Sequence, residues 1–290
     1  MTPRSSLLAR PARWLARHPV CGWSLVAAFT AFNILSHNAV QSIAGWLGEQ
    51  LTIERLSLIV TAGGLLAGAA LLAILALRLR RHPAGVVIAA YGLATLALIA
   101  VAYNTLFMIN TEAIHFPQYA LMGMIVFPLV GRVAESITWV TLFGAFDEAW
   151  QYWVLNSEVD FAYFDFNDIV LNLLGAAMGV LLAAALLGDT RERGAAGYGL
   201  RDFARSPALA VTGAFVAAGA VLWMLGPLSV LPGGDAWVVL MRSGAREAYW
   251  ETSYWGKTAH VLLPLEGLVV TFALLALYLP LDRRIRWRLP

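Results

Sequence analysis

Residues 166–187 read FNDIVLNLLGAAMGVLLAAALL, and Asp168 is the only charged residue in this stretch. A bilayer-spanning helix needs roughly 20 mostly apolar residues, because the hydrocarbon core is about 30 Å thick and each helical residue rises about 1.5 Å. The stretch therefore predicts a transmembrane helix. Asp168 lies near its beginning, where an ionisable side chain needs a buried or hydrated setting to avoid the cost of facing lipid.

Six more stretches have the length and apolar character of a membrane span. They cover residues 56–77, 85–107, 113–131, 133–154, 208–227 and 258–280. A weaker eighth stretch, residues 23–45, is apolar at first and then carries several polar residues, so we expect its outer end to be bent or interfacial. None of the stretches alternates as barrel strands do, and a bilayer leaves open strands without backbone partners. The sequence therefore predicts an all-α, polytopic transmembrane helical bundle of about eight spans.

The composition agrees with a membrane protein. Hydrophobic residues make up 60% of the chain and charged residues 13%, and the mean hydropathy of +0.69 lies outside the balance expected of a soluble domain. The single cysteine, Cys21, excludes an intramolecular disulfide. The net charge of +2 gives no sign of nucleic-acid binding. The Arg-rich start has no convincing small-residue cleavage site, so we expect it to precede an anchor rather than to belong to a cleaved signal peptide.

The basic residues predict the orientation of the bundle. Sixteen of the twenty Lys and Arg residues lie before the first span, after the last span or in alternate connections. These are Arg4, Arg10, Arg13, Arg17, Arg78, Arg80, Arg81, Arg132, Arg191, Arg193, Arg201, Arg205, Arg283, Arg284, Arg286 and Arg288. The exceptions are Arg55, Arg242, Arg246 and Lys257. The positive-inside rule makes the Arg-rich side cytoplasmic, with both termini inside. The connection before residue 166 is acidic, with Glu158, Asp160 and Asp165, and is expected outside.

The spans divide into three expected regions. Residues 1–110 hold three spans, residues 111–190 form a core of three, and residues 191–290 hold two. The longest connection, residues 228–257, is aromatic-rich and suits an amphipathic segment at the outer membrane interface. Its aromatic residues include Trp237, Tyr249, Trp250, Tyr254 and Trp255.

Polar side chains gather at the predicted extracytoplasmic ends of the three core spans. The groups are Glu112, His115 and Tyr119, then Asp147, Glu148 and Gln151, then Asp165, Asp168 and Asn172. Spacings of three and four residues place the first and third groups each on one helical face. Residues that are expected at the same level are His37, Asn38, Gln41, His260 and Glu266. Gly175 and Gly179 continue the third group in a GxxxG spacing that lets another helix approach closely. The sequence thus predicts an acidic cavity that opens to the outside.

These residue types support several kinds of chemistry. The carboxylates and His115 can bind a cation, act as acid and base, or recognise a polar headgroup. The candidate catalytic residues are Glu112, His115, Asp147, Glu148, Gln151, Asp165, Asp168 and Asn172. A divalent cation is the cofactor that these residues suggest, and its candidate ligands are Glu112, His115, Glu148 and Asp168. A polar network that only fastens helices together, with His115 as a hydrogen-bonded member, also accounts for these residues.

Residues 112–179 resemble the VanZ-like family. The resemblance rests on E-x-x-H-x-x-x-Y from Glu112, FDEAWQ at residues 146–151 and DFNDIVLNLLGAxxG at residues 165–179. The family comprises bacterial membrane proteins and is named for a teicoplanin-resistance accessory protein. The resemblance implies a protein of the bacterial cytoplasmic membrane with a role in the cell envelope and antibiotic resistance. Family members often carry an Arg before the aspartate motif, whereas residues 156–164 contain none, so any contact of that Arg with an anionic ligand is lost or changed.

Three classes of function fit these observations. The outward clustering favours a protein, surrounded by membrane lipids, that binds or acts on a lipid-linked or glycan envelope component, with catalysis left open. A transporter needs a polar path to the cytoplasm, but the inner halves of the spans are almost free of ionisable groups and no inverted repeat is clear. A non-catalytic subunit of a larger membrane complex would dock protein partners on its apolar exterior and on residues 228–257.

Overall fold

The computed structural model describes residues 9–80, 82, 84–107, 110–159, 162–187, 206–232, 235–242, 250–252, 258–285 and 287. Within this part of the chain, seven helices are long and apolar enough to cross a membrane. The fold is therefore that of a helical, multi-pass membrane protein, as the composition predicts. The sequence features that lie outside the described residues are Arg4, Arg81, Asp160, Arg191, Arg193, Arg201, Arg205, Arg246, Tyr249, Tyr254, Trp255, Lys257, Arg286 and Arg288.

The order of the helices follows the predicted spans. The first are α1 (Ala9–Arg17), α2 (Pro19–Leu51), α3 (Ile53–Leu79) and α4 (Gly85–Thr105). The central ones are the 3-10 turn η1 (Asn110–Ile114), α5 (His115–Val130), α6 (Val133–Trp150), the π-helical turn η2 (Gln151–Leu155) and α7 (Phe166–Leu187). The last are α9 (Pro207–Leu225), α10 (Pro264–Tyr278) and the 3-10 turn η3 (Leu279–Arg283).

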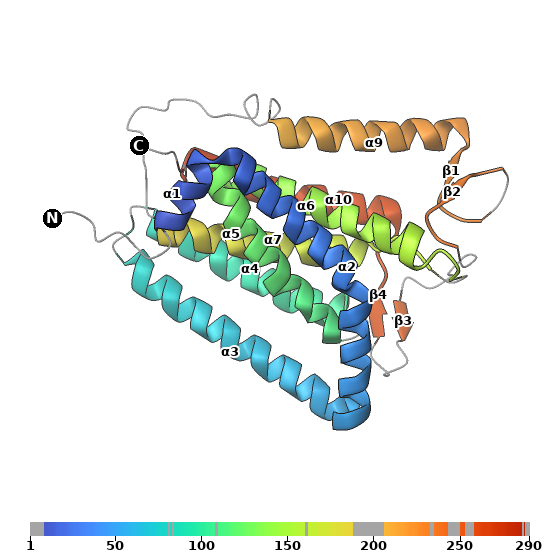
Figure 1. Cartoon of the computed structure of the whole chain (residues 1–290), viewed down its shortest axis with the longest axis horizontal. Coiled ribbons are helices and arrows are strands. Elements are labelled where there is room, and N and C mark those ends of the chain that lie inside the picture. Colours follow the sequence, from blue (N-terminus) through green and yellow to red (C-terminus); the bar gives the residue numbers. More distant parts are fainter. Residues whose placement is uncertain are drawn as a thin grey trace.

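The described part of the connection between α9 and α10 forms short strands. β1 (Leu228–Ser229) pairs in parallel with β2 (Val238–Val239), and β3 (Trp250–Thr252) pairs antiparallel with β4 (Thr258–His260). Figure 1 shows these strands at one end of the helical bundle and α1 at the other. The ends of the bundle therefore differ in structure.

Two predicted spans begin differently in the structure. The helix expected from residue 258 begins only at Pro264, because a proline holds the preceding residue, Leu263, in an extended conformation with ψ 157°. Residues 258–260 form β4 instead. The span expected at residues 113–131 opens with η1, so Glu112 does not share the α-helical register of His115. α2 extends beyond residue 45, and Figure 1 shows that it changes direction in its second half.

α7 is the central helix of the bundle, and small residues explain how closely it packs. Nearly all of its length is buried, and its most extensive contacts are with α5. A Cβ atom on Gly175 would lie 2.8 Å from the carbonyl oxygen of Phe116, and one on Gly179 would overlap the backbone of Ala120. On α5, a Cβ atom on Gly123 would lie 2.7 Å from the carbonyl oxygen of Ala176. Glycine at these positions allows the two backbones to touch.

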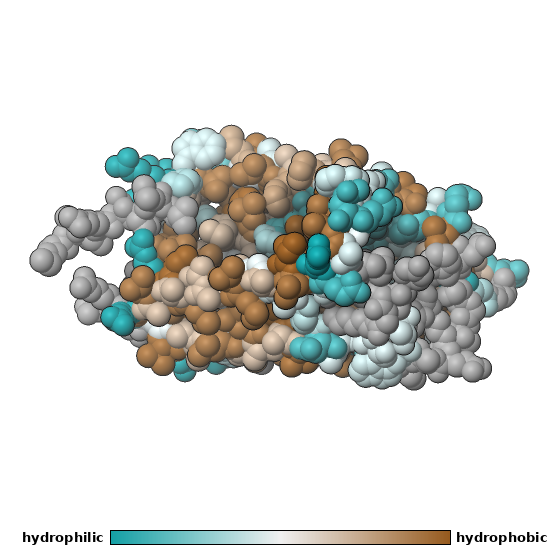
Figure 2. Space-filling model, turned by 90° about the horizontal axis from the view of Figure 1, so that it is seen from below, coloured by the Kyte–Doolittle hydropathy of each residue, from teal (hydrophilic) through white to brown (hydrophobic). Residues whose placement is uncertain are grey.

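The margins of the bundle are apolar and exposed. α3 and α9 lie on opposite sides in Figure 1 and are almost entirely exposed along their lengths. Their large exposed side chains include Leu65, Leu66, Phe215 and Trp223. Figure 2 shows hydrophobic residues over much of the face on which α3 lies. Such a surface suits contact with lipid chains rather than with water.

Buried carboxylates occur at the end of the bundle that carries α1. Arg132 forms an ion pair with Glu135 in the first turn of α6. Asp282 accepts a hydrogen bond of 2.8 Å from the backbone N–H of Ala134 and so caps the same helix. The expectation that the inner halves of the spans are almost free of ionisable groups therefore misses Glu135 and Asp282. Asp282 thus caps the beginning of α6, and Glu135 pairs with the Arg that precedes the helix.

Candidate functional site

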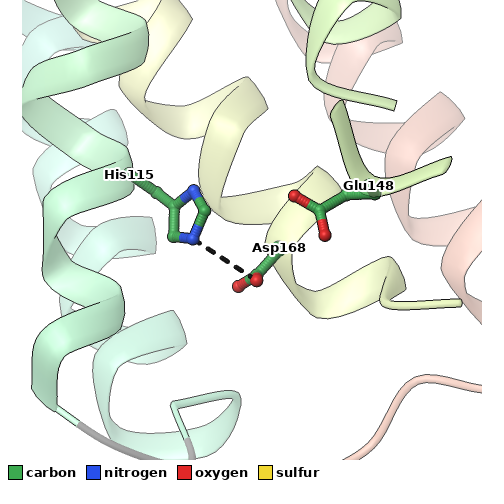
Figure 3. Close-up of side chains that lie close together, drawn as sticks. All are labelled: His115, Glu148 and Asp168. Carbon is green, nitrogen blue, oxygen red and sulfur yellow. Dashed lines mark ion pairs between the residues drawn. The ribbon is translucent and has the colours of Figure 1, made fainter. Parts of the chain in front are cut away.

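Three ionisable side chains from three helices converge at the end of the bundle opposite α1. His115 is the first residue of α5, Glu148 lies in the last turn of α6, and Asp168 lies in the first turn of α7. Nε2 of His115 is 3.3 Å from Oδ2 of Asp168. One nitrogen or oxygen atom of each residue lies within 4.8 Å of those of the other two. Figure 3 shows the Glu148 carboxylate pointing toward the His115 and Asp168 pair.

The beginning of α7 fixes the position of Asp168. Oδ1 of Asp165 accepts hydrogen bonds from the backbone N–H groups of Asn167, at 2.8 Å, and Asp168, at 3.2 Å. This is the usual role of an aspartate that caps a helix. Burial and the neighbouring Asp168 carboxylate raise the pKa of Asp165 to about 7. Asp165 thus organises the first turn of α7 and adds to the acidic character of its surroundings.

A second buried pair lies on the same face of α5. The hydroxyl of Tyr119 donates a hydrogen bond of 2.9 Å to Oδ2 of Asp147. The other carboxylate oxygen, Oδ1, makes no hydrogen bond within the described part of the chain. Tyr119 also lies beside the ring of His115, with 6.2 Å between the ring centroids. The tyrosine and carboxylate therefore border the three-residue cluster.

Asn172 lies one helical turn after Asp168 on α7 and is fully buried. Its side chain fits beside Gly144, where an added Cβ atom would lie 2.9 Å from the amide nitrogen of Asn172. The amide is close enough to act on the Glu148 carboxylate, but neither of its polar atoms makes a hydrogen bond of normal geometry with a described residue. A buried polar group without a partner costs about 1–3 kcal/mol, so the unpaired amide of Asn172 is a costly feature of this site.

Gln151 is held by a change in helix type. α6 ends at Trp150, and the backbone N–H of Asn156 bonds to the carbonyl of Gln151 in the π-helical turn η2. Such turns often occur at functional sites. The amide of Gln151 donates to Oε1 of Glu148 at 3.3 Å. The turn thus keeps Gln151 buried against the carboxylate that it supports.

The remaining predicted residues take different positions. Glu112 acts electrostatically on His115 but is not one of the three residues that converge. His37 of α2 interacts electrostatically with Asp147, Asp168 and His115. A fourth helix therefore contributes to the site. Asn38 and Gln41 are exposed. His260 and Glu266 pair with each other, at 2.7 Å.

Two residues that support the site were not predicted from the sequence. The amide of Asn167 donates to the carbonyls of Leu106, at 2.9 Å, and His260, at 2.7 Å, and accepts from the N–H of Leu262 at 2.9 Å. Asn167 thereby joins α7 to the ends of two distant segments. Its position inside the aspartate motif at residues 165–179 is the only sequence signal for this role.

Arg242 is the other such residue. It belongs to the connection between α9 and α10, and its guanidinium contacts the connection between α6 and α7, which has no Arg of its own. Its guanidinium donates to the carbonyls of Asn156, Ser157, at 2.9 Å, and Tyr152, at 3.0 Å. It also lies 4.5 Å from the centre of the Tyr152 ring. The guanidinium thus bonds to backbone carbonyls, and Arg242 stabilises the conformation of the connection between α6 and α7. Nothing in the sequence near residue 242 indicates this long-range contact.

The site is strongly acidic. Four carboxylates, those of Asp147, Glu148, Asp165 and Asp168, interact with one another electrostatically. Within the described part of the chain, their side-chain partners in hydrogen bonds and ion pairs are Tyr119, Gln151 and His115. Lys and Arg side chains do not take part in these bonds. The arrangement can therefore hold protons or a cation, but it cannot attract an anion by itself.

Comparison of the chain with known protein families, with curated proteins and with solved structures finds no match. The geometry of the site and the polarity of the two ends of the bundle therefore carry the functional argument.

Proposed function

We propose that the chain is a VanZ-like protein of the bacterial cytoplasmic membrane that binds a lipid-linked or glycan component of the cell envelope at the outer leaflet. The observation that carries the proposal is the convergence of His115, Glu148 and Asp168 from three helices. Buried ionisable groups in a membrane protein usually mark a functional site, because they are costly to keep there. The proposal concerns recognition of the component and leaves open whether the site transforms it.

The proposed orientation rests on where the charges lie. The described Arg residues of α1, together with Arg132 and Arg283, lie at one end of the bundle, and the acidic cluster lies at the other. The positive-inside rule assigns the Arg-rich end to the cytoplasm. The cluster then faces the outer leaflet, where envelope precursors with large polar headgroups are found.

The proposed span count is eight, with both termini inside. α6 adds to the seven apolar helices because it lies within the bundle beside α5 and α7. Its 18 residues include three acidic ones, Glu135, Asp147 and Glu148. All three are buried, so their charge does not oppose a transmembrane position. α1 and η3 lie at the same end of the bundle, which agrees with an even number of spans.

A complementation experiment tests the proposal. The gene is deleted in its own host, and plasmid copies are compared for growth under teicoplanin or another cell-wall stress. We expect Glu148→Ala and Asp168→Ala to fail to complement while reaching wild-type levels in the membrane fraction. Glu158→Ala is the matched control, because Glu158 is an exposed carboxylate in the connection between α6 and α7. Full complementation by both site variants refutes the proposal.

Native mass spectrometry of the purified protein identifies the ligand class. The wild-type protein is expected to retain an added polyprenyl-phosphate-linked lipid better than phosphatidylglycerol, and Asp168→Ala is expected to lose this preference. Equal retention of the two lipids by the wild-type protein counts against recognition of an envelope precursor.

A further inference from the structure

We infer that His115, Glu148 and Asp168 bind one divalent transition-metal cation, such as Zn²⁺ or Mn²⁺, and that this cation is what receives an anionic headgroup. The binding of the cation follows from the site itself. The second part, the contact with a headgroup, rests on the function proposed above.

The distances between the three side chains suit a metal ion. Two ligands at about 2.1 Å from a tetrahedral metal lie about 3.4 Å apart. Nε2 of His115 and Oδ2 of Asp168 are 3.3 Å apart, which matches this edge. The largest separation in the cluster, no more than 4.8 Å, closes to the same length when the Glu148 side chain moves by about 1.4 Å. Rotation about the flexible side-chain bonds of a glutamate covers this movement.

The charge of the site favours a cation. Asp147 and Asp165 act electrostatically on Glu148 in addition to Asp168. Four acidic groups close together in a buried setting repel one another, and His115 supplies at most one positive charge. A divalent cation relieves this repulsion. Without one, a phosphate group entering the site meets four acidic groups and a single imidazole.

A second observation independently indicates a ligand. Asn172 is fully buried beside Glu148, and neither of its amide atoms makes a hydrogen bond of normal geometry with a described residue. Oδ1 of Asp147 is buried and lacks a partner as well. Both groups border Glu148. A water molecule or an oxygen ligand on the metal provides the donor and acceptor that these atoms need.

The ligand types select the class of metal. Imidazole suits Zn²⁺ and neighbouring transition metals, whereas Mg²⁺ and Ca²⁺ prefer a shell of oxygen atoms. Three protein ligands leave at least one coordination position open, as in metal sites that bind a substrate. A phosphate oxygen of a headgroup fits that position. The inference thus explains how an acidic site accommodates an anionic ligand.

Metal binding by the purified full-length chain tests the inference. The protein is treated with a chelator in detergent, desalted and titrated with Zn²⁺ or Mn²⁺ against a chromophoric competitor, and the bound metal is counted by mass spectrometry. We expect one Zn²⁺ per chain, and a loss of affinity of at least about 10–100-fold in His115→Gln and Asp168→Asn. Glu158→Gln and His260→Gln are the controls and should bind as the wild-type protein does. Unchanged affinity in both site variants overturns the inference.

X-ray absorption of the wild-type zinc complex keeps the test valid if a variant fails to fold. A shell of nitrogen and oxygen ligands that includes one imidazole supports the site, and a sulfur ligand or a shell without imidazole overturns it. Lipid retention with and without chelator separates the two proposals. Retention that resists the chelator but needs Asp168 refutes the contact between the cation and the headgroup and leaves the proposed function. Metal binding without retention of a polyprenyl-phosphate lipid removes the proposed function and leaves the metal site.

Discussion

Gly179→Ala tests whether close packing of α5 on α7 holds the site together. The added Cβ atom would lie 2.6 Å from the Cα atom of Ala120 and nearer still to its carbonyl oxygen, whereas ordinary contacts begin at 3.4 Å. These are backbone atoms that cannot rotate away, so the two helices must separate by about 1 Å or more. Overpacking of this kind costs about 1–3 kcal/mol, and we expect the upper end of that range.

The same movement reaches the site, because α5 carries His115 and α7 carries Asp168. Separation of the helices by about 1 Å lengthens their contact from 3.3 Å to about 4 Å. Loss of stability and loss of ligand binding should therefore occur together. A role of Gly179 in helix packing alone, without connection to the site, would change only the stability.

The assay follows thermal unfolding of the purified protein by tryptophan fluorescence in one detergent. A chain of this size loses roughly 2 °C in its midpoint for each kcal/mol, so we expect a fall of about 6 °C. Gly213→Ala is the control, because nothing lies within 4 Å of a Cβ atom on Gly213. Alanine there should leave the midpoint unchanged or raise it slightly. A midpoint for Gly179→Ala at or above that of the wild-type protein refutes the reasoning.

Three further substitutions test residues that hold the bundle around the site. Asn167→Ala removes three hydrogen bonds, two of them buried and one partly buried, and leaves their partners unsatisfied, which should cost about 3 kcal/mol. Asp282→Ala removes the cap on the N–H of Ala134 and should cost about 1–2 kcal/mol, while Asp282→Asn should restore part of it. Arg242→Gln loses bonds to backbone carbonyls near the site and should cost about 1–2 kcal/mol.

The same fluorescence measurement checks all three substitutions. Asn104→Ala is the control for Asn167, because Asn104 is exposed and its side chain bonds within its own helix. Equal losses in these two alanine variants would contradict the structural role of Asn167. No rescue by asparagine at position 282 would argue against capping, and an unchanged midpoint for the Arg242 variant would show that its contacts do not stabilise the connection.

The spans that the sequence predicts best are uninterrupted apolar runs. α3, α4, α7 and α9 begin and end within three residues of the predicted limits, because length and hydropathy determine where such helices can lie in a bilayer. α10 begins later than predicted, since hydropathy does not register the conformational effect of Pro264 on its neighbour. α1 has polar residues on one side and is too short for a span, so a search for apolar runs misses it.

The site is partly visible in the sequence. The spacing of Asp165, Asp168 and Asn172 indicates one face of one helix, and the GxxxG spacing indicates a close neighbour. Which residue of the neighbour meets Asp168 depends on the relative shift of the two helices, and this is set by the contact of Gly175 with Phe116. Spacing within one segment carries no information about such a shift. The same limitation explains why the contacts of Arg242 were not foreseen.

Asn167 also bears on the order in which the protein is made. Its partners at residues 260 and 262 are synthesised long after α7, so the side-chain amide cannot form these hydrogen bonds until the last part of the chain has been made. Before then, the three helices of the site can insert and pack, but their outward end stays loosely joined. Ribosome-bound chains that stop before residue 258 should therefore be more sensitive to protease at this end than chains that continue past residue 285. The outward end of the site would then become fully ordered only when synthesis of the chain is nearly complete.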